Sequence, residues 1–528
     1  MNGSLSNQQW LIKSLQNPKL YDHPVSRFEV IETHISWVLL TGDFVYKIKK
    51  PVNFGFLDFS TLEKRRYNCR EELRLNSRLA PQLYLGLVKI SGSKENPELD
   101  GPGPAIEYAV RMIQFPQAAQ FDCLPPEGGL DNAIIAQLAG TVAHFHLSVS
   151  LAPLDSDFGG VEHVRKTVME NFQHIRNCIH DQQLIVQLDS LQQWSMKQLE
   201  TVAPVIEERK VLGFVRECHG DMHLRNIALL QEDILIFDCI EFNRGLRFID
   251  VISEIAFLIM DLEARKKAPL ATHFLNEYMQ ITGDFEGLRL LRFYKVYRAL
   301  VRAKVDILRT AQERPGSKEY VQTVEDFYQY LNLAKKYTRI TSPVLIINHG
   351  VSGTGKSAGA SALSDRISAI QLRSDVERKR LLGKDNNDGM ESGTGKGIYS
   401  PEASQKAYNR LVELAHTLLT AGYSVIIDAA NLKSSQRQLF AGLSRLLNVR
   451  FLILSYTASV ETLRSRVEER ALHGSDVSDA TVAILEHQLK TCEPLSLQEQ
   501  NSTLEINTDI PLDINSIVRY IEGDGKKK

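Results

Sequence analysis

A short apolar run that leads into a glycine-rich turn constrains the fold of this chain more than any other feature. Val344-Leu345-Ile346-Ile347 has the composition of a buried strand, and Gly350-Val351-Ser352-Gly353-Thr354-Gly355-Lys356-Ser357 follows two residues later. The sequence beyond Lys356 is typical of a helix. A strand, a glycine-rich turn and a helix in this order predict one unit of an open, mostly parallel sheet.

The glycine-rich turn fits the pattern G-x-x-x-x-G-K-[S/T]. In this pattern the glycines let backbone N–H groups surround a phosphate, the lysine reaches the β- and γ-phosphate oxygens, and the hydroxyl ligates Mg²⁺. We therefore expect an ATP site whose phosphate-binding residues are Gly350, Ser352, Gly353, Thr354, Gly355, Lys356 and Ser357. The alternative, a turn with an exposed lysine, leaves the flanking strand and helix unexplained.

A second glycine-rich stretch resembles the first one in composition. Ser392-Gly393-Thr394-Gly395-Lys396-Gly397 has no apolar run before it, and Gly397 stands where the metal-binding hydroxyl is required. We therefore expect a loop near the acceptor side of the site and not a second phosphate site.

Two acidic residues follow predicted strands of this region. Asp428 ends the apolar run Ser424-Val425-Ile426-Ile427, at the strand end where open α/β sheets bind ligands, and we expect it to organise Mg²⁺. Capping of the next turn is the alternative. Asp375 follows Ile370-Gln371-Leu372 and is placed to accept a proton from an attacking hydroxyl, with Arg378 one turn on to hold an anionic substrate. On spacing alone, an N-cap role for Asp375 is an equal alternative.

Three arginines, Arg464, Arg466 and Arg470, precede the glycine-containing stretch Leu472-His473-Gly474-Ser475-Asp476. Arginines beside such a lid neutralise charge that develops on a transferred phosphoryl group. The spacing does not decide which of the three acts, and we take Arg470 as the candidate.

Together these segments resemble a small P-loop kinase of the AAA type, whose relatives include polynucleotide 5′-kinases and zeta-toxin-like kinases. The resemblance covers about residues 344–510. It rests on the P-loop, on residues 373–378 and 425–432, and on the arginine-rich lid with Ser478-Asp479-Ala480. It implies ATP, Mg²⁺ and an acceptor hydroxyl activated by Asp375, and it leaves the acceptor open.

The densest motif of the N-terminal half is Cys218-His219-Gly220-Asp221-Met222-His223-Leu224-Arg225-Asn226. Its Asp-to-Asn spacing matches the catalytic loop H-R-D-x-x-x-x-N of kinases. In that logic Asp221 deprotonates the acceptor hydroxyl, Asn226 holds a metal, and Asp238, after the apolar run Ile234-Leu235-Ile236-Phe237, is the second metal ligand. Zinc binding by the two histidines is the alternative, but the glycine disfavours a helix there and no third ligand is evident.

Kinase chemistry also requires a strand lysine paired with a helical glutamate. Strand alternation places Lys47 and Lys49 of Phe44-Val45-Tyr46-Lys47-Ile48-Lys49 on one face, and we prefer Lys47 because it is nearer the strand centre. The predicted helix at residues 62–79 offers Glu71 and Glu72, of which we choose Glu72.

These N-terminal residues resemble the aminoglycoside phosphotransferase-like (protein-kinase-like) superfamily, which uses an H-G-D-x-H-x-x-N loop, over about residues 25–335. The subgroup fused to a P-loop kinase is also similar at residues 42–51, 56–59 and 75–76. The chain departs from kinases in having no G-x-G-x-x-G loop over the phosphates, so residues 31–36 would have to serve. Relatives phosphorylate varied hydroxyls, so the resemblance does not identify a substrate.

A chain of 528 residues is long enough for two to four domains of roughly 150 residues each. Short strand-like runs precede mostly helical sequence, which predicts an α+β, two-lobed, protein-kinase-like domain over residues 1–338, with a small lobe at about 1–115 and a helical lobe at about 116–338. We expect a surface turn at residues 92–103. Thr341-Ser342-Pro343 breaks a helical pattern. The α/β P-loop NTPase domain with a parallel sheet is then predicted over residues 341–522, followed by a polar tail at 523–528.

Composition bounds the partners and the compartment. A formal net charge of −2 gives no reason to expect a nucleic-acid backbone as the main partner, although a nucleic-acid end is not excluded for the C-terminal domain. Six scattered cysteines, no signal peptide and no apolar stretch of about 20 residues predict a cytoplasmic protein without membrane contact.

The function expected from the sequence is that of an ATP-dependent phosphotransferase with two unrelated kinase-like domains. These domains would transfer the γ-phosphate to hydroxyl groups of small-molecule acceptors, with Mg²⁺. In the alternative, the N-terminal domain is a non-catalytic, ligand-sensing module that regulates a single active P-loop kinase or ATPase. A third possibility is a P-loop half that acts as an NTP-driven switch without an acceptor.

Overall fold

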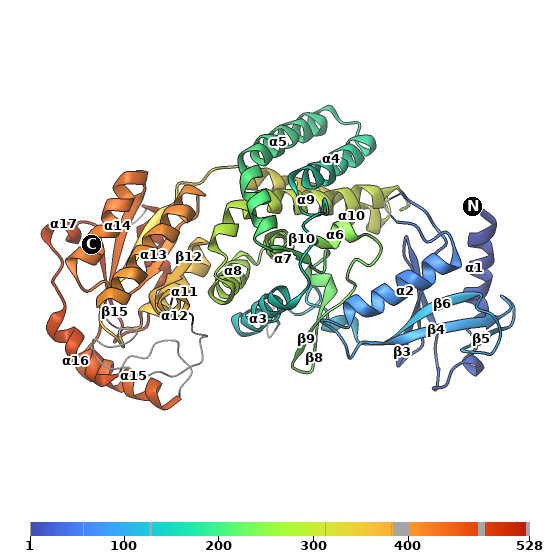
Figure 1. Ribbon diagram of the computed structural model, residues 1–528, viewed down its shortest axis with the longest axis horizontal. Helices are drawn as coiled ribbons and strands as arrows, with labels where there is room; N and C mark the ends of the chain where they lie inside the picture. The colour runs from blue at the N-terminus through green and yellow to red at the C-terminus, as the bar shows by residue number, and fades with distance from the viewer. Residues whose placement is uncertain are drawn as a thin grey trace. The chain divides into compact units, whose positions relative to one another are not determined.

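The computed structural model of the chain describes residues 2–55, 57–125, 129–311, 313–381, 383, 401–473 and 481–523. It divides into two compact units (Figure 1), of which the first comprises Met1–Asp261 and Leu300–Pro315, and the second Leu262–Ala299 and Gly316–Lys528. The second unit thus includes helices that precede the boundary predicted near residue 340. The predicted glycine-rich loop at 392–397, the lid residues 474–480 and the tail beyond 523 lie outside the described residues.

The first unit begins with a six-stranded antiparallel sheet in the order β1-β2-β3-β6-β4-β5. The strands are β1 (Glu29–Glu32), β2 (Ser36–Leu40), β3 (Phe44–Lys49), β4 (Tyr84–Gly92), β5 (Pro97–Leu99) and β6 (Glu107–Ile113). Helix α1 (Asn2–Ser14) packs against one face through Leu11 and Ile12, joined by Leu15 directly after the helix. Helix α2 (Leu62–Asn76), which Thr61 caps, packs against β4 and β6 (Figure 1).

The rest of the first unit is mostly helical, as the sequence predicts. Its helices are α3 (Asn132–Ser148), α4 (Val161–Cys178), α5 (Gln182–Val211), α6 (Arg244–Arg247), most of α7 (Val251–Ala264) and the end of α9 (Leu288–Thr310). Two short antiparallel pairs interrupt them, formed by β7 (Val215–Glu217) with β10 (Phe248–Asp250), and by β8 (Ile227–Leu230) with β9 (Asp233–Ile236). The loop with Asp221 and Asn226 connects β7 to β8, so the two pairs fix both of its ends.

The second unit is built on a five-stranded parallel sheet in the order β12-β13-β11-β14-β15. Its strands are β11 (Val344–His349), β12 (Ile370–Arg373), β13 (Val425–Asp428), β14 (Arg450–Thr457) and β15 (Thr503–Asn507). Ile347 of β11 pairs with Ile427 of β13. The residues that follow these two positions therefore lie together at the carboxyl ends of the strands, where open α/β sheets bind ligands.

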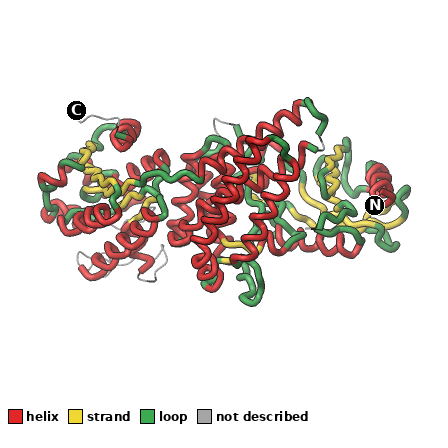
Figure 2. Tube along the Cα trace, turned by 90° about the horizontal axis from the view of Figure 1, so that it is seen from above, coloured by secondary structure: helices red, strands yellow, loops and turns green. Residues whose placement is uncertain are grey.

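Helices cover both faces of this sheet (Figures 1 and 2). Ile346 and Ile426 share a buried cluster with α11 (Lys356–Ile367) and α18 (Ile514–Glu522). The alternate residues Ile347 and Ile427, also fully buried, face the opposite side, where α13 (Pro401–Thr420) and α14 (Ser434–Leu447) contact β11. The remaining helices of this unit are α8 (Ala268–Thr282), the first part of α9, α10 (Lys318–Tyr337), α12 (Ser374–Leu381), α15 (Val460–His473), α16 (Val482–Thr491) and α17 (Leu497–Gln500).

The predicted fold class is confirmed in both halves, and the differences are local. The sequence patterns missed β1, β5 and β15, which are outer strands of their sheets. The expected surface turn at 92–103 is wrong in part because it contains β5, which pairs with β4. Both short outer strands in the first unit pair on one side only, and they therefore show little of the apolar alternation that identifies a strand. Among the helices that the structure describes, none is long and apolar enough to cross a membrane.

Candidate active sites

The glycines of the P-loop allow its close approach to neighbouring backbone. Gly350 has φ of +145° and Gly353 has φ of +85°, which side-chain-bearing residues rarely adopt. A Cβ atom on Gly350 would lie 2.5 Å from the carbonyl oxygen of Tyr456 in β14, and one on Gly353 would lie 2.8 Å from that of Leu463 in α15. Because backbone cannot yield as a side chain does, both positions require glycine for this loop shape.

Lys356 is the first residue of α11, and its ammonium group turns back over the loop that precedes it. Its Nζ donates to the carbonyl oxygen of Val351 at 2.6 Å and lies 3.3 Å from the hydroxyl of Thr354. Burial lowers the pKa of Lys356 to about 8, although the carboxylates of Asp428 and Asp375 oppose this shift. A cation that is poorly solvated and bonded only to neutral oxygens in these two contacts suits a polyphosphate.

Asp428 ends β13 beside the P-loop and is almost fully buried. Each of its carboxylate oxygens accepts a hydrogen bond from a side-chain amide: Oδ1 from Asn348 at 3.3 Å, and Oδ2 from Gln371 at 3.0 Å. The Nε atom of Arg373 lies 3.8 Å from Oδ2. Asp428 is therefore held as part of a network and not as the cap of the following turn.

Asp375 lies in the first turn of α12, directly after β12. Since the helix begins at Ser374, Asp375 is not its N-cap residue, and that alternative interpretation is not supported. Its carboxylate pairs with Arg378 one turn later, at 2.9 Å. The sequence predicted both residues on the acceptor side, and they share one wall of the site.

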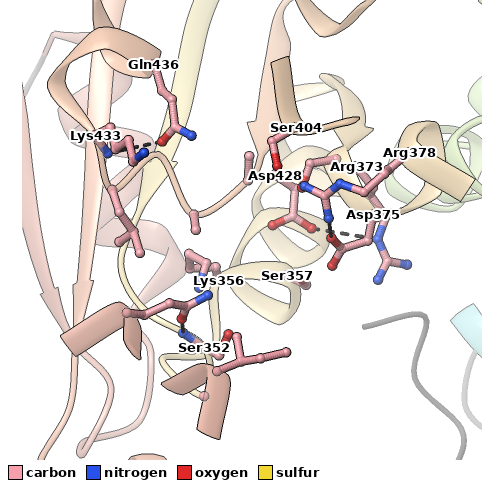
Figure 3. A pocket seen from close by; sticks show the side chains of 18 of the residues that line it. Ser352, Lys356, Ser357, Arg373, Asp375, Arg378, Ser404, Asp428, Lys433 and Gln436 are labelled. Atoms are coloured by element: carbon pink, nitrogen blue, oxygen red, sulfur yellow. Dashed lines mark hydrogen bonds and ion pairs between the residues drawn. The ribbon is translucent and has the colours of Figure 1, made fainter. Parts of the chain in front are cut away.

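These residues line one cavity of about 470 Å³ among the described residues. Figure 3 shows Asp428, Asp375, Arg373 and Arg378 on one side of it, with Lys356 and Ser357 from the P-loop on another. The remaining described lining residues are Ser352, Gly353, Gly355, Ala358, Ser374, Ser404, Tyr408, Ala429, Ala430, Leu432, Lys433, Gln436, Arg466, Arg470, Ile484, His487, Gln488 and Thr491. The P-loop and the predicted acceptor side thus open into a single space.

The three candidate arginines of α15 lie in different environments. Arg464 is exposed and pairs with Glu486 at 2.5 Å, outside the cavity. Arg466 donates to the carbonyl oxygen of Gly353 at 3.2 Å and to that of Thr508 at 2.7 Å, so it braces the P-loop. Arg470 lines the cavity together with Arg466, and its role on the transferred phosphoryl group stays a prediction.

Several residues of this site escaped the sequence patterns. Asn348 and Gln371 hold Asp428, while Gln488 accepts the backbone N–H of Ser352 at 2.7 Å. A polar residue in an otherwise apolar strand is the only local signal, and it marks Asn348 and Gln371 as positions where a buried amide must have a partner. Lys433, the N-cap residue of α14, and Gln436, in its first turn, carry no comparable signal.

In the first unit, the loop after β7 brings Asp221 and Asn226 together. The amide of Asn226 donates to the backbone carbonyl of Asp221 at 3.0 Å and to its carboxylate at 3.2 Å. The Nε2 atom of His223 lies 3.4 Å from the same carboxylate. Burial alone would raise the pKa of Asp221, but His223 and more distant cations outweigh it and hold that pKa well below its usual range. Asp221 is therefore ionised at neutral pH.

Glu254 of α7 fixes the beginning of this loop. Its fully buried carboxylate accepts the backbone N–H groups of His219 at 2.8 Å and of Gly220 at 2.6 Å, and His146 lies 3.2 Å away. Burial would raise the pKa of Glu254, yet His146 and the other donors lower it to about 2. His219 itself bonds to the carbonyl oxygen of Phe237, so it acts as a structural residue and its pairing with His223 as a zinc site is not supported.

The strand lysine and the helical glutamate lie together as predicted. Lys47 Nζ is 2.8 Å from Glu72 and 2.5 Å from Asp238. Lys49 Nζ also binds Glu72, at 2.7 Å, and pairs with Glu241. Burial opposes the charge of Lys47, but Asp238 and Glu72 raise its pKa well above the usual value, and the two lysines lower that of Glu72 to about 2. Glu241 is the member of this cluster that the sequence patterns missed.

The segment predicted to cover the phosphates in place of a glycine-rich loop forms the turn between β1 and β2. The backbone N–H of Thr33 donates to the carbonyl oxygen of Ser36 at 2.9 Å, and Lys50 bonds to the carbonyl oxygen of Thr33 at 2.5 Å. This hairpin belongs to the same sheet as Lys47. Its role over a nucleotide stays a prediction.

The chain is similar to one family model and to proteins of two mycobacteria. The family model described as an AAA domain matches residues 345–495. An uncharacterized protein of Mycobacterium tuberculosis (strain H37Rv) is 30% identical over 478 residues, which cover 88% of this chain and 91% of the relative. A protein of Mycobacterium bovis matches with the same identity and coverage.

Solved structures match each half with low similarity. Amicoumacin kinase in complex with AMP-PNP, Ca²⁺ and its ligand is 10% identical, with a TM-score of 0.40, over 63% of this chain and 95% of that one. A kinase from Chloroflexus aurantiacus is 23% identical, with a TM-score of 0.29, over 35% of this chain and 97% of that one. By its sequence similarity along almost the whole chain, this protein belongs to the same family as the two mycobacterial proteins, and residues 345–495 form an AAA domain with a P-loop.

Proposed function

We propose that this protein is an ATP-dependent phosphotransferase with two separate sites that transfer the γ-phosphate to hydroxyl groups of small-molecule acceptors. One observation carries the proposal: each unit gathers a lysine, carboxylates suited to a divalent metal, and a further acid suited to an acceptor hydroxyl. Two unrelated folds that assemble the same three chemical parts support a common reaction.

In the second unit, Lys356 and the P-loop amides bind the phosphates, while Ser357 and Asp428 would hold Mg²⁺. Asp375 accepts the proton of the attacking hydroxyl, and Arg470 stabilises the transferred phosphoryl group. In the first unit, Lys47 orients the phosphates from its pair with Glu72, and Asp221 is the acceptor of the proton. Asn226 and Asp238 would hold the metal there. In both sites, bound Mg²⁺ neutralises phosphate charge and fixes the nucleotide's geometry.

The acceptor of the second unit is proposed to be anionic. The wall of the cavity that carries Asp375 also carries Arg373 and Arg378 (Figure 3). Two arginines beside the proton acceptor favour a hydroxyl compound that bears a carboxylate or a phosphate. Transfer from labelled ATP should therefore be faster to gluconate than to glucose, and to glycerol 3-phosphate than to glycerol. Equal or reversed preference in both pairs would refute an anionic acceptor.

The whole proposal is tested by calorimetric titration with Mg²⁺ and a non-hydrolysable ATP analogue. We expect two sites in the wild type, one lost in Asp238→Ala and the other in Lys356→Ala. Asp233→Ala and Lys406→Ala, which change exposed residues on β9 and α13, are the matched controls and should keep both. A wild-type protein with no nucleotide site would overturn the proposal.

The direct contact of Lys47 with Asp238 favours a second candidate for the first unit. That pair joins the proposed phosphate ligand to the proposed metal ligand at 2.5 Å, so a nucleotide must separate them in order to bind. If it does not, the first unit senses another ligand and regulates the P-loop site. A titration with a single site that only Lys356→Ala abolishes would support this candidate.

A cytoplasmic location belongs to the same proposal. All six cysteines are free, and Cys123 is exposed. Free thiols on a protein surface are typical of a reducing compartment, where ATP is also supplied.

A further inference from the structure

An edge of the parallel sheet in the second unit is completed by a helix and not by another strand. β12 is the outermost strand on its side, and it pairs with β13 through alternate residues. The backbone of Gln371 points the other way, where its N–H donates to Oδ1 of Asn276 at 2.8 Å and its carbonyl oxygen accepts from Gln280 at 2.8 Å. Asn276 also donates to the carbonyl oxygen of Ala369 at 3.0 Å.

These contacts make the side-chain amides of α8 substitute for a neighbouring strand. Asn276 accepts from Gln371 of β12 and donates to Ala369, the residue directly before that strand, and it is 4% exposed. A buried strand edge needs such partners because unsatisfied backbone groups each cost about 1–3 kcal/mol. The position of β12 is therefore set from both sides, by β13 and by α8.

The side chain of Gln371 in turn holds the candidate metal ligand, Asp428. It donates to Oδ2 of Asp428 at 3.0 Å, and both residues are buried, at 7% and 6% exposed. Asn348 shares this task from the other carboxylate oxygen, and Arg373 lies 3.8 Å from Oδ2. A carboxylate that is held by one amide on each oxygen has a fixed orientation, and a shift of Gln371 would turn it.

The same helix also contacts α12 and α11, which carry other candidate site residues. The carbonyl oxygen of Gln280 accepts from Arg380 of α12 at 2.7 Å. At the end of α8, Gly283 has φ of +70°, and a Cβ atom there would lie 2.6 Å from Nε of Arg380, so glycine admits this contact. His273 lies 3.2 Å from Asp365 of α11. Helix α8 thus contacts β12, α12 and α11 within one compact unit.

We propose that Gln371 is a positioning residue for Asp428 and that Asn276 and Gln280 of α8 set the position of Gln371. The P-loop site is then completed by a helix whose contact residue lies 95 positions earlier in the chain than Gln371, in the stretch that the sequence assigns to the other domain. This inference rests on the proposed function, because it takes Asp428 as a metal ligand.

The test compares metal affinity with nucleotide affinity in full-length variants. Each carries Asp238→Ala, which removes one of the two proposed metal ligands of the first unit. Mn²⁺ binding is followed by electron paramagnetic resonance in the presence of AMP-PNP, and AMP-PNP binding without metal is followed by calorimetry. Gln371→Leu and Asn276→Leu remove the amides at similar volume, and Glu277→Gln changes a half-buried residue of the same helix as the matched control.

We expect Gln371→Leu and Asn276→Leu to weaken Mn²⁺ binding about 10-fold or more, as is typical for residues that orient a metal ligand. Metal-free AMP-PNP binding should stay near the wild-type value, which a merely unfolded site would not allow. The Mn²⁺ affinity of the double variant should fall no further than that of the single variant that binds Mn²⁺ more weakly, because Asn276 acts on the metal site through Gln371. Glu277→Gln should match the parent protein.

Each other outcome has a definite meaning. Unchanged Mn²⁺ affinity in Gln371→Leu overturns the positioning role, and a loss in Gln371→Leu without one in Asn276→Leu overturns the role of α8. If Asn276→Leu does not fold, Gln280→Leu, at a half-buried position, takes its place under the same criteria. A parent protein that binds no Mn²⁺ with AMP-PNP contradicts the proposed function itself, and this inference with it.

Discussion

Lys49 Nζ lies 2.7 Å from the carboxylate of Glu72, and it is one of two lysines that share that carboxylate. The other is Lys47. The side chain of Lys47 is 15% exposed and also reaches Asp238, whereas that of Lys49 is 1% exposed and pairs with Glu241. Because a nucleotide can reach only the more exposed ammonium group, the geometry divides the two lysines into one for ligand binding and one for structure.

This division predicts different effects for the two lysine variants. Lys49→Met leaves Glu241 and part of Glu72 buried without a cation, so we expect a loss of about 3–5 kcal/mol in the free energy of unfolding. Lys47→Met should weaken AMP-PNP binding to the first unit about 10-fold or more with a smaller loss of stability. Chemical denaturation and calorimetry measure both quantities in a Lys356→Ala background. Equal effects of the two variants on nucleotide affinity would contradict the division.

Glu254 is expected to stabilise the loop that carries Asp221, in a pH-dependent way. Glu254→Gln supplies one carbonyl oxygen where two carboxylate oxygens accept N–H groups, so we expect a loss of about 1–3 kcal/mol at neutral pH. The pKa of Glu254 is lowered from 4.5 to about 2 in the folded protein. As pH falls, the unfolded chain binds the proton first, so the contribution is complete above about pH 4.5 and is lost as pH falls through about 2.

Urea unfolding of the two proteins between about pH 7 and 3 measures this difference. The free-energy gap between wild type and Glu254→Gln should be constant above about pH 5 and should narrow below it. A gap that widens as pH falls would show that the carboxylate is not the stabilising form.

Nucleotide binding to the P-loop should take up a proton near pH 8. The pKa of Lys356 is lowered to about 8 by burial, so about half of the molecules carry the proton at that pH, and phosphates favour the charged form. Calorimetry of AMP-PNP binding in Tris and in HEPES, in an Asp238→Ala background, measures the uptake. Lys356→Arg stays charged and is the control, from which proton exchange by the nucleotide itself is subtracted. Identical uptake in both proteins would exclude Lys356 as its source.

The lowered pKa of Lys356 also affects the free energy of unfolding at alkaline pH. Between about pH 8 and 10.5 the unfolded chain holds the Lys356 proton while the folded protein has lost it, so this residue makes the free energy of unfolding rise with pH. Lys356→Met should lack this rise. Thermal unfolding at several alkaline pH values, compared between the two proteins, isolates the contribution of one lysine.

The arginines of α15 should separate by function. Arg470 lines the cavity, and Arg464 pairs with Glu486 outside it. Arg470→Ala should lower kcat by about 10³-fold with little change in the KM for ATP, because an arginine that acts on the transferred phosphoryl group acts mainly in the transition state. Arg464→Ala is the matched control. ATP turnover, with an acceptor or as slow hydrolysis, reports both, and similar rates in the two variants would remove Arg470 from the proposed mechanism.

The sequence alone determined what depends on short spacing. Three features can be recognised from a few consecutive residues: the P-loop, the Asp221-to-Asn226 step and the strand with Lys47. Each is a single turn or strand whose backbone shape needs particular residues. The two fold classes follow from the same local patterns. The motif specifies glycine at positions 350 and 353, and the structure shows the close backbone contacts that require it there.

Only the tertiary structure decided which distant side chains complete the sites. No spacing relates Asn276 to Gln371, or Lys49 to Glu241, and no sequence pattern ranks Arg470 above Arg464. These relationships arise because a buried amide, ammonium or strand edge must find a partner wherever packing brings one. Which partner such a group finds depends on residues that are distant in the chain and close in space. Local sequence therefore does not determine it.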